Sequence, residues 1–554
     1  MSATLNPVIG REFFGILRSP KAFGTLLAIT IVFSLAVLLR WPTDNTADLS
    51  GQDSIQVFRV FGYGLLAGIV MLVPAFPATS IVNEKNSGTL ALLLNSPLSG
   101  PAVYLGKFLG VLLFALLVLF ASAPGAAACY AMGGIALLGD LGLLYVVLIL
   151  LTLQYIALGM LISSYVHSSD AGVRVTYAIV FSLLFLTQAP GLLFPGSLNA
   201  FGGVIDVIRF ASPLPIIMEL MRQDSVANTG LISQSGILWF VVISLISTIA
   251  FATVTLSRLN YRLFDRSRSK GIITDDQSLG TRLARRLLFI VDPQRRKAGI
   301  AWFLNPVMVK EFRSRKFGRS QWLFRLIAVC AISSVVLTLA AATGVTAWGT
   351  ETIGGLMVLL QVVLIVMLTP SLAAGLISGE RDGGGWELLR LTPLSAFRIA
   401  WGKLLSVLWT LSMVLLATLP GYLVMIWIRS ELLPQIQLVM VCLAWTVLYA
   451  LAVSAAVGCL FRSTALSTAA SYIAVMTLFL APLLVWLGRD APFGFDLVQN
   501  SLLINPVGAA MSIMETPGFA QYNLLPQAWI VAGAVSLSMF LLFGLKVWRL
   551  TRPV

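Results

Sequence analysis

Long runs of apolar residues constrain this chain more than any other feature of its sequence. Each run has about twenty residues or more, which at ~1.5 Å rise per residue is long enough to cross a ~30 Å hydrocarbon core as a helix. Twelve runs are present, near residues 22–39, 57–82, 103–131, 141–164, 173–194, 232–256, 322–342, 353–378, 400–428, 435–460, 465–487 and 528–547. We therefore expect an all-α polytopic membrane protein with twelve transmembrane helices.

The composition and the distribution of charge fit a membrane protein. Hydrophobic residues make up 58% of the chain and charged residues 11%, whereas a soluble protein carries ~25% charged residues. The formal net charge of +14 is concentrated between Ser257 and Arg325, where 17 Lys and Arg accompany 5 Asp and Glu. Positive residues stay on the cytoplasmic side of membrane proteins, where they meet anionic lipid. This bias predicts that both termini are cytoplasmic. Because no nucleic-acid-reader motif is present, we expect no nucleic acid partner.

The sequence repeats itself in two halves. Asn6-Pro7-Val8 recurs as Asn305-Pro306-Val307, 299 positions later. At an offset of 296 positions, Pro74, Glu84, Gly88, Pro97 and Lys107 recur as Pro370, Glu380, Gly384, Pro393 and Lys403. Each half would hold an even number of helices, six, so both halves enter the membrane from the same side as parallel repeats. The expected domains are a first six-helix half at 1–256, a basic cytoplasmic linker at 257–300 and a second six-helix half at 301–554.

A short basic amphipathic segment precedes the first apolar run of each half. Asn6 and Asn305 are good helix N-caps, and the proline after each suits the first helical position. Ile9, Phe13 and Ile16 share one helical face, and arginines occupy another. Such a helix should lie in the headgroup layer of the membrane. The alternative is a cytoplasmic extension of the first span.

The loop after the second apolar run of each half carries another amphipathic pattern. In the first half it predicts a helix over 87–94 with an apolar stripe of Leu90, Leu93 and Leu94. A second helix is predicted to start at Ser96-Pro97, a hydroxyl N-cap before a proline at the first helical position. An apolar stripe of leucines on a cytoplasmic loop indicates that another surface packs against it. Either the loop folds back onto the membrane surface, or another protein docks on it.

This ordered set of motifs, present in both halves, resembles the ABC-2 class of ABC transporter permeases. The Asn-Pro-Val openings followed by Glu-Phe are similar to the branch related to multicopper-enzyme maturation permeases. The resemblance implies that the first amphipathic element is a connecting helix and that the loop after the second span forms a coupling helix on a separate ATPase. It further implies an exporter in a bacterial cytoplasmic membrane, driven by two ATPase subunits that bind the ATP and magnesium. Because one chain holds both halves, a full pathway would not require a homodimer.

The resemblance assigns the ATPase contacts to matching positions in the two loops. These are Glu84, Gly88, Leu90, Leu93, Pro97, Lys107, Glu380, Gly384, Leu388, Leu389, Pro393 and Lys403. The second loop departs from the first in its three glycines before Trp386. Glycine is conformationally permissive, so this more flexible start would make the two docking sites unequal.

Two kinds of residue inside the apolar runs are candidates for movement and for the transport path. Pro74 and Pro370 precede the repeated glutamates, and a proline can kink a span and act as a hinge. Membrane helices also tolerate proline without such a role. The deepest polar candidates for the path are Gln154, Gln188 and Gln361, although hydrogen bonds between helices would explain each of them equally well.

Several other chemistries find no support in the sequence. No phosphate loop of the G-x4-GK-[ST] type occurs, so we expect a transport subunit and not an enzyme. The single histidine, His167, and the four cysteines form no catalytic or metal-binding pattern, so we expect no catalytic residue, metal or cofactor in this chain. A secondary transporter with two parallel six-helix repeats is the alternative, but it usually needs buried charges for ion coupling, which are scarce here. A membrane-embedded enzyme would need convergent Asp, His or Cys residues.

Overall fold

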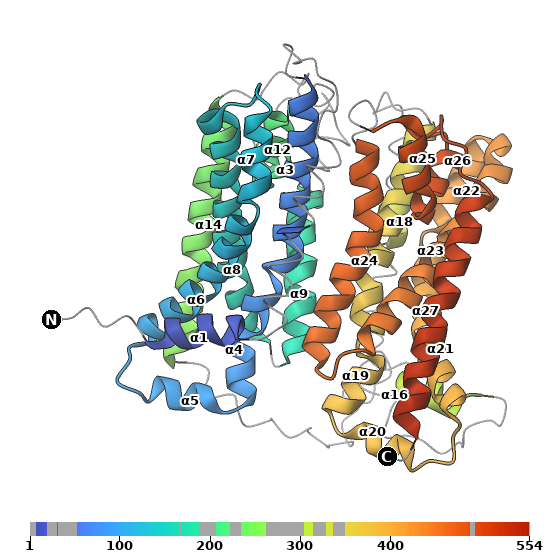
Figure 1. The fold of residues 1–554 in the computed structure, drawn as a ribbon. Helices are drawn as coiled ribbons and strands as arrows, with labels where there is room; N and C mark the ends of the chain where they lie inside the picture. The colour runs from blue at the N-terminus through green and yellow to red at the C-terminus, as the bar shows by residue number, and fades with distance from the viewer. Residues whose placement is uncertain are drawn as a thin grey trace. The chain divides into compact units, whose positions relative to one another are not determined.

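The computed structural model describes residues 7–18, 30–31, 52–166, 168–187, 207–221, 234–261, 304–313, 328, 330–335, 350–487 and 493–552. Within these residues the secondary structure is helical and contains no strand, which confirms the expected all-α fold. The chain divides into two compact units (Figure 1). One comprises Met1–Arg268 and Leu484–Phe495, and the other comprises Ser269–Leu483 and Asp496–Val554. The division falls inside the expected linker at 257–300, whose first residues, up to Tyr261, continue a helix; the rest of the linker lies outside the described residues.

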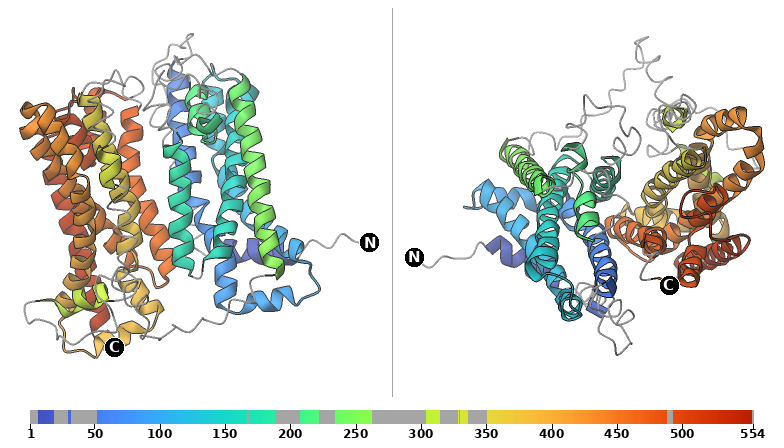
Figure 2. Two further views of the ribbon diagram at one scale, coloured as in Figure 1. Left: turned by 180° about the vertical axis from the view of Figure 1, so that it is seen from behind. Right: turned by 90° about the horizontal axis from the view of Figure 1, so that it is seen from above.

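The first unit consists of long helices that run side by side and shorter ones at their ends (Figures 1 and 2). Its elements are α1 (Pro7–Leu17), α3 (Gln52–Leu72), α4 (Ala75–Asn86), α5 (Thr89–Leu94), α6 (Gly100–Ala121), α7 (Ala123–Ala131), the π-helical η1 (Leu137–Gly142), α8 (Leu143–Tyr165), α9 (Ser169–Phe181), the π-helical η2 (Ser182–Leu186), α12 (Leu214–Leu220) and α14 (Gln234–Tyr261).

The second unit is built from the same kinds of element. They are α16 (Pro306–Arg313), α18 (Thr350–Ala373), α19 (Gly375–Asp382), α20 (Gly385–Arg390), α21 (Ala396–Ala417), α22 (Leu419–Ile428), the 3-10 helix η4 (Ser430–Leu432), α23 (Leu433–Gly458), α24 (Thr464–Leu487), α25 (Phe495–Leu503), α26 (Pro506–Ile513) and α27 (Gln527–Thr551).

Nine helical stretches among the described residues are long and apolar enough to cross a membrane. They correspond to nine of the twelve expected runs. The runs expected at 22–39 and 322–342 lie for the most part outside the described residues, and the run at 173–194 is described only as far as Thr187, as α9 and η2. The structure thus supports an integral membrane protein, and the number of twelve spans stays a prediction.

A glycine allows two helices to approach closely at the centre of each unit. In the first unit α8 packs against α4, and a Cβ atom on Gly159 would lie 2.7 Å from the Cγ of Pro77. In the second unit α23 packs against α19, and a Cβ atom on Gly458 would lie 2.5 Å from the carbonyl oxygen of Ala374. Both distances are shorter than real Cβ contacts, so each crossing depends on the missing side chain.

The second and third apolar stretches of each unit are interrupted helices. In the second stretch α3 gives way to α4 at Pro74, and α18 contains Pro370 and gives way to α19 four residues later, at Ala374. In the third stretch, Ser122 separates α6 from α7 and Thr418 separates α21 from α22. From the sequence, each third stretch was predicted to be one continuous helix. The proline two residues after Ser122 and after Thr418 is the signal for the break, because its missing N–H interrupts the helical ladder.

The short entry helices pack on the third stretch of their own units. α1 lies across the long helices of the first unit (Figures 1 and 2) and packs on α6. The contact is made by Val8, which is 3% exposed, and by Glu12. If Gly110 of α6 carried a Cβ atom, that atom would lie only 2.6 Å from the Cβ of Glu12. α16 packs on α21, and its expected N-cap is confirmed because the Asn305 Oδ1 accepts a hydrogen bond of 2.9 Å from the Val307 N–H. The corresponding Asn6 lies outside the described residues.

Short helices also follow the fifth stretch of each unit. α12 in the first unit and α26 in the second are buried along much of their length, and Met221 at the end of α12 is 0% exposed. Arg59 of α3 donates a hydrogen bond of 2.7 Å to the carbonyl oxygen of Met221. This contact fastens the end of α12 to the second stretch of its own unit.

Candidate functional site

A buried lysine joins three helices at one end of the first unit. The Nζ of Lys107, in α6, lies 2.7 Å from the Oε1 of Glu12 in α1 and 3.1 Å from the Oε1 of Glu84 in α4. The Lys107 side chain is 3% exposed, and those of Glu12 and Glu84 are 20% and 13% exposed. The entry helix, the end of the second stretch and the start of the third therefore meet at one charged atom.

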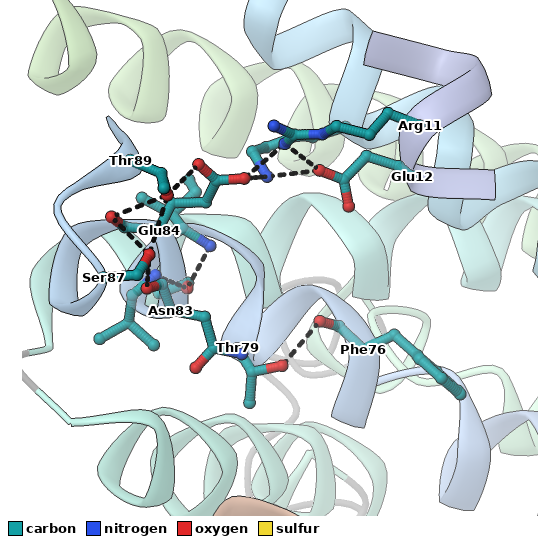
Figure 3. Close-up of polar contacts among 12 residues, drawn as sticks. Arg11, Glu12, Phe76, Thr79, Asn83, Glu84, Ser87 and Thr89 are labelled. Carbon is teal, nitrogen blue, oxygen red and sulfur yellow. Dashed lines mark hydrogen bonds and ion pairs between the residues drawn. The ribbon is translucent and has the colours of Figure 1, made fainter. Parts of the chain in front are cut away.

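Two further side chains complete this ion-pair cluster (Figure 3). Arg11 donates to the Glu84 carboxylate and, at 2.8 Å, to the Oε1 of Glu12. From the opposite side, the Thr89 hydroxyl donates a hydrogen bond of 2.8 Å to the Oε2 of Glu84, so that the start of α5 is tied back to α4. Burial alone would lower the pKa of Arg11, but its contacts with Glu12 and Glu84 raise that pKa above its usual value, which keeps the guanidinium charged.

The second unit contains the same arrangement of charges. The Nζ of Lys403, in α21, lies 2.6 Å from the Oε1 of Glu311 in α16 and 3.2 Å from the Oε1 of Glu380 in α19. Lys310 forms an ion pair with Glu380, as Arg11 does with Glu84. The Lys403 side chain is 1% exposed. The repeated residues, 299 positions apart in the entry helices and 296 apart in the later motifs, thus make the same contacts.

Such a cluster holds its helices together because the buried lysine at its centre cannot lose its carboxylate partners without a large penalty. Transfer of an ammonium group from water into a protein interior costs several kcal/mol, which nearby carboxylates with good geometry offset. Each cluster has two cations and two carboxylates and is therefore neutral as a whole. The sequence analysis expected Lys107 and Lys403 at a surface contact. Both lysines are instead buried, so they hold the surrounding helices in place and are not themselves exposed at the surface.

The turn that leads into each short helix depends on one glycine. Gly88 has a φ of +74° and Gly384 a φ of +72°, in the left-handed region that glycine adopts without steric cost. Each follows the last turn of the preceding helix, α4 or α19, and redirects the chain into α5 or α20. The two glycines that the sequence analysis singled out thus have the same backbone role.

The segment after each short helix differs from the sequence prediction. No helix begins at Ser96-Pro97, because the Ser96 hydroxyl donates a hydrogen bond of 2.6 Å to the Leu93 carbonyl and so closes the end of α5. Thr392 makes the same contact with Leu389, also at 2.6 Å. The long helices begin four residues after Ser96 and Thr392, at Gly100 and Ala396, behind Ser99 and Ser395. The prediction was wrong because either of two serines could have been the N-cap.

The burial of the leucines in the two short helices follows one pattern. In α5, Leu90 is buried at 5% exposure, Leu93 is half-buried, and Leu92 is 72% exposed. In α20, Leu389 is buried at 8% exposure, whereas Leu388, 296 positions after Leu92, is 70% exposed. Pro97 and Pro393 are exposed as well. Of the expected contact residues, Leu388 and the two prolines therefore lie at the surface, while Leu90 and Leu389 pack inward.

The exposed side of α5 borders a groove of 340 Å³ between α5 and α1. It is lined by Pro7, Val8, Arg11, Thr89, Leu92, Leu93, Ser96 and Leu98. Most of these lining atoms are apolar, and Arg11 brings the neighbouring ion-pair cluster to the edge of the groove. A protruding apolar side chain of another protein would fit such a surface.

The glutamines proposed for the transport path make hydrogen bonds between helices. Gln154, 4% exposed, donates a hydrogen bond of 2.9 Å from α8 to the Ser247 hydroxyl in α14. Gln361, 2% exposed, donates to the hydroxyl of Thr418, at the break between α21 and α22, and accepts from Tyr422 at 3.0 Å. Gln188 and His167 lie outside the described residues. Among the described residues, no group of His, Cys, Asp and Glu has the arrangement of a metal site.

A comparison with known protein families gives a match to the first unit. Residues 7–268 match the family model of the ABC-2 family transporter protein. The matched region, which is similar to this family of transporter membrane proteins, spans α1, the ion-pair cluster of Lys107 and the first unit up to α14. No curated protein matches the chain at a significant level. The cluster of Lys403 repeats the geometry of the ABC-2 region outside the matched residues.

Three features of this site were missing from the residues that the sequence predicted. Glu12 and Glu311 close the clusters, and the repeated Glu-Phe dipeptides could have revealed them. Leu92 is exposed on α5, but helical periodicity cannot show which side of so short a helix faces the protein. The contact of α20 with the end of α27, described below, has no signal in the sequence.

Proposed function

We propose that the chain is the permease subunit of an ABC exporter in a bacterial cytoplasmic membrane, and that separate ATPase subunits drive it by docking on α5 and α20. The ABC-2 match of residues 7–268 supports a transport role. The two halves would act as parallel repeats of six spans each and form one translocation path without a homodimer. The sequence contains no phosphate loop, so the energy has to come from a partner that binds ATP and magnesium.

The observation that carries this proposal is the paired exposure of Leu92 and Leu388. A leucine that is 72% or 70% exposed at the centre of a short helix gains ~1.5–3 kcal/mol when a partner buries it. The same exposure at positions 296 apart favours two equivalent docking sites. Leu92 and Leu388 lie outside the apolar membrane runs, and this position favours a protein partner over lipid.

The ion-pair clusters explain how docking on α5 and α20 would reach the spans. α5 is tied to Glu84 by Thr89, and Glu84 is tied to α1 and α6 by Arg11 and Lys107. A push on α5 would therefore move the ends of the second and third stretches as one body. The interruptions at Pro74 and Ser122 provide points where the outer parts of those stretches could turn independently.

The test is recovery of an ATP-binding partner with the tagged full-length chain from its native membranes in mild detergent. The partner is labelled with 8-azido-ATP, and mass spectrometry establishes whether the labelled protein contains a phosphate loop. The variants are Leu92→Asp, Leu388→Asp and the double substitution. Leu138→Asp is the matched control, since Leu138 is 87% exposed on η1, which is at the other end of the first unit from α5 (Figure 1).

We expect each single substitution to lower recovery of the ATPase about tenfold, in line with ~1.4 kcal/mol of lost contact, and the double substitution to abolish it. Leu138→Asp should leave recovery unchanged. An ATPase recovered equally well with the double variant would refute the assignment of α5 and α20 as docking sites. Absence of any labelled ATPase with the unchanged chain would refute the proposed transporter class and favour a secondary transporter.

A further inference from the structure

The short helix α20 makes two side-chain hydrogen bonds to the end of the last long helix of its unit. Trp386, at the start of α20, is 4% exposed, and its indole N–H donates a hydrogen bond of 3.3 Å to the carbonyl oxygen of Leu550. Arg390, at the end of α20, donates a hydrogen bond of 3.0 Å to the carbonyl oxygen of Arg552. Both acceptors lie at the C-terminal end of α27. One side of α20 is thereby attached to the last long helix of the second unit.

These contacts satisfy groups that a helix leaves unpaired at its end. The last four carbonyl groups of an α-helix have no N–H donor within the helix. Arginine side chains commonly satisfy such groups, and a cation is also favourable beside the negative end of the helix dipole. Trp386 and Arg390 thus form a C-terminal cap for α27 that a separate helix supplies. Arg552 packs over the Trp548 ring with its guanidinium carbon 3.5 Å from the ring centroid, which adds to the order of this end.

The matching positions in the first unit explain why α20 needs this attachment. Thr89 in α5 corresponds to Gly385 in α20 at the offset of 296 positions. The Thr89 hydroxyl ties α5 to Glu84, but Gly385 has no side chain to make the equivalent bond. A Cβ atom on Gly385 would lie 2.3 Å from the Oε2 of Glu380, so the carboxylate occupies the space that a side chain would need. At Gly385 there is therefore no side-chain hydrogen bond to the second stretch that would match the bond from Thr89 to Glu84.

The next position shows the opposite change. Leu90 of α5 corresponds to Trp386 of α20, and both are buried, at 5% and 4% exposure. Leucine can only pack at this position, whereas tryptophan packs and also donates a hydrogen bond through its indole N–H. The second unit has therefore exchanged a threonine contact with the preceding helix for a tryptophan contact with the last helix.

We propose that Trp386 and Arg390 are positioning residues that fasten α20 to the C-terminal end of α27, so that α20 moves together with the last span of its unit while α5 moves with its second span. The coupling role of α20 rests on the proposed function. The attachment itself does not. A force applied to the two short helices would accordingly enter the two units through different spans.

Hydrogen–deuterium exchange measured by mass spectrometry tests the attachment in the purified full-length chain in detergent, with no ATPase present. The variants are Trp386→Phe, which keeps an aromatic ring but removes the donor, Arg390→Met, which keeps the apolar stem, and the double substitution. Arg398→Met, at an exposed arginine near the start of α21, is the control. Peptides that cover 385–391 report on α20, and peptides that cover 89–94 report on α5 in the same sample.

We expect exchange in 385–391 to accelerate on the order of tenfold in the double variant, the effect of two lost hydrogen bonds, and by less in each single variant. Exchange in 89–94 should stay unchanged, and Arg398→Met should match the unaltered chain in both segments. Unchanged exchange in 385–391, or equal acceleration in both segments, would overturn the proposal. Since this readout needs no partner, its failure is distinct from the absence of an ATPase.

Discussion

The ammonium group of Lys403 lies 2.6 Å from the carboxylate of Glu311, in the equivalent position to the 2.7 Å contact between Lys107 and Glu12. Each of these pairs joins an entry helix to the third stretch of its unit, and in both the lysine is almost completely buried. A second carboxylate, from Glu84 or Glu380, shares the same ammonium group. The helices that lead into each membrane unit are therefore held in place by a single buried charge.

Removal of this charge should destabilise the second unit. Lys403→Met keeps most of the side-chain volume but leaves Glu311 without the buried cation 2.6 Å away. Loss of one partner from a buried ion pair costs about 3 kcal/mol or more. We expect a clearly lower melting temperature by tryptophan fluorescence in detergent, with Arg398→Met as the exposed control. A Lys403→Met variant that melts with the unaltered chain would show that the cluster contributes nothing to stability.

The left-handed glycine before each short helix should resist substitution. Gly384→Ala places a side chain at a φ of +72°, which costs about 1 kcal/mol, so we expect a small loss of stability and weaker ATPase recovery. Gly375→Ala in α19 is the matched control, because a Cβ there meets nothing within 4 Å and the backbone is helical. Recovery of the ATPase and the melting temperature are measured for both. Equal behaviour of the two variants would contradict the role of the turn.

The crossing of α23 and α19 should be intolerant of a methyl group. Gly458→Ala would bring a Cβ atom to 2.5 Å from the Ala374 carbonyl oxygen and 2.7 Å from its Cα, both backbone atoms that cannot rotate away. Overpacking of this kind costs about 1–3 kcal/mol. Gly544→Ala in α27, where a Cβ meets nothing within 4 Å, should be neutral or slightly stabilising. The measurement is the melting temperature of the two variants. A Gly458→Ala variant that melts at the same temperature as the unaltered chain would contradict the close packing of α23 on α19.

Glu219 in α12 should make stability depend on pH. Burial raises its pKa above 4.5, and its Oε2 has no hydrogen-bond partner among the described residues. A raised pKa in the folded state means that its contribution to stability is present at low pH and is lost as the pH rises through the folded-state pKa. We expect Glu219→Gln to be more stable than the unaltered chain at pH 8 and equal to it at pH 4, as judged by melting temperatures. The same difference at both pH values would refute this.

Much of the architecture was predictable because its signals are local. A span needs a continuous apolar run of sufficient length, and each of the nine stretches found in the described residues coincides with a run visible in the sequence. The entry helix after Asn305 was also visible, since helix capping involves residues close together in the chain. The turn at Gly88 was not, because the sequence predicted a helix over 87–94 that included this glycine, whereas α5 begins at Thr89. The repeat at 296 positions further indicated which residues to compare.

The sequence by itself determined the helical membrane class, the repeated motifs and the two loops that carry the candidate site. Only the tertiary structure decided that Lys107 and Lys403 are buried, that Leu92 and Leu388 are exposed, and that α20 caps the end of α27. The physical reason is distance along the chain. Helical periodicity establishes which residues share a face, but whether that face is covered depends on segments as remote as the 95 positions between Glu12 and Lys107, or the 164 between Trp386 and Leu550.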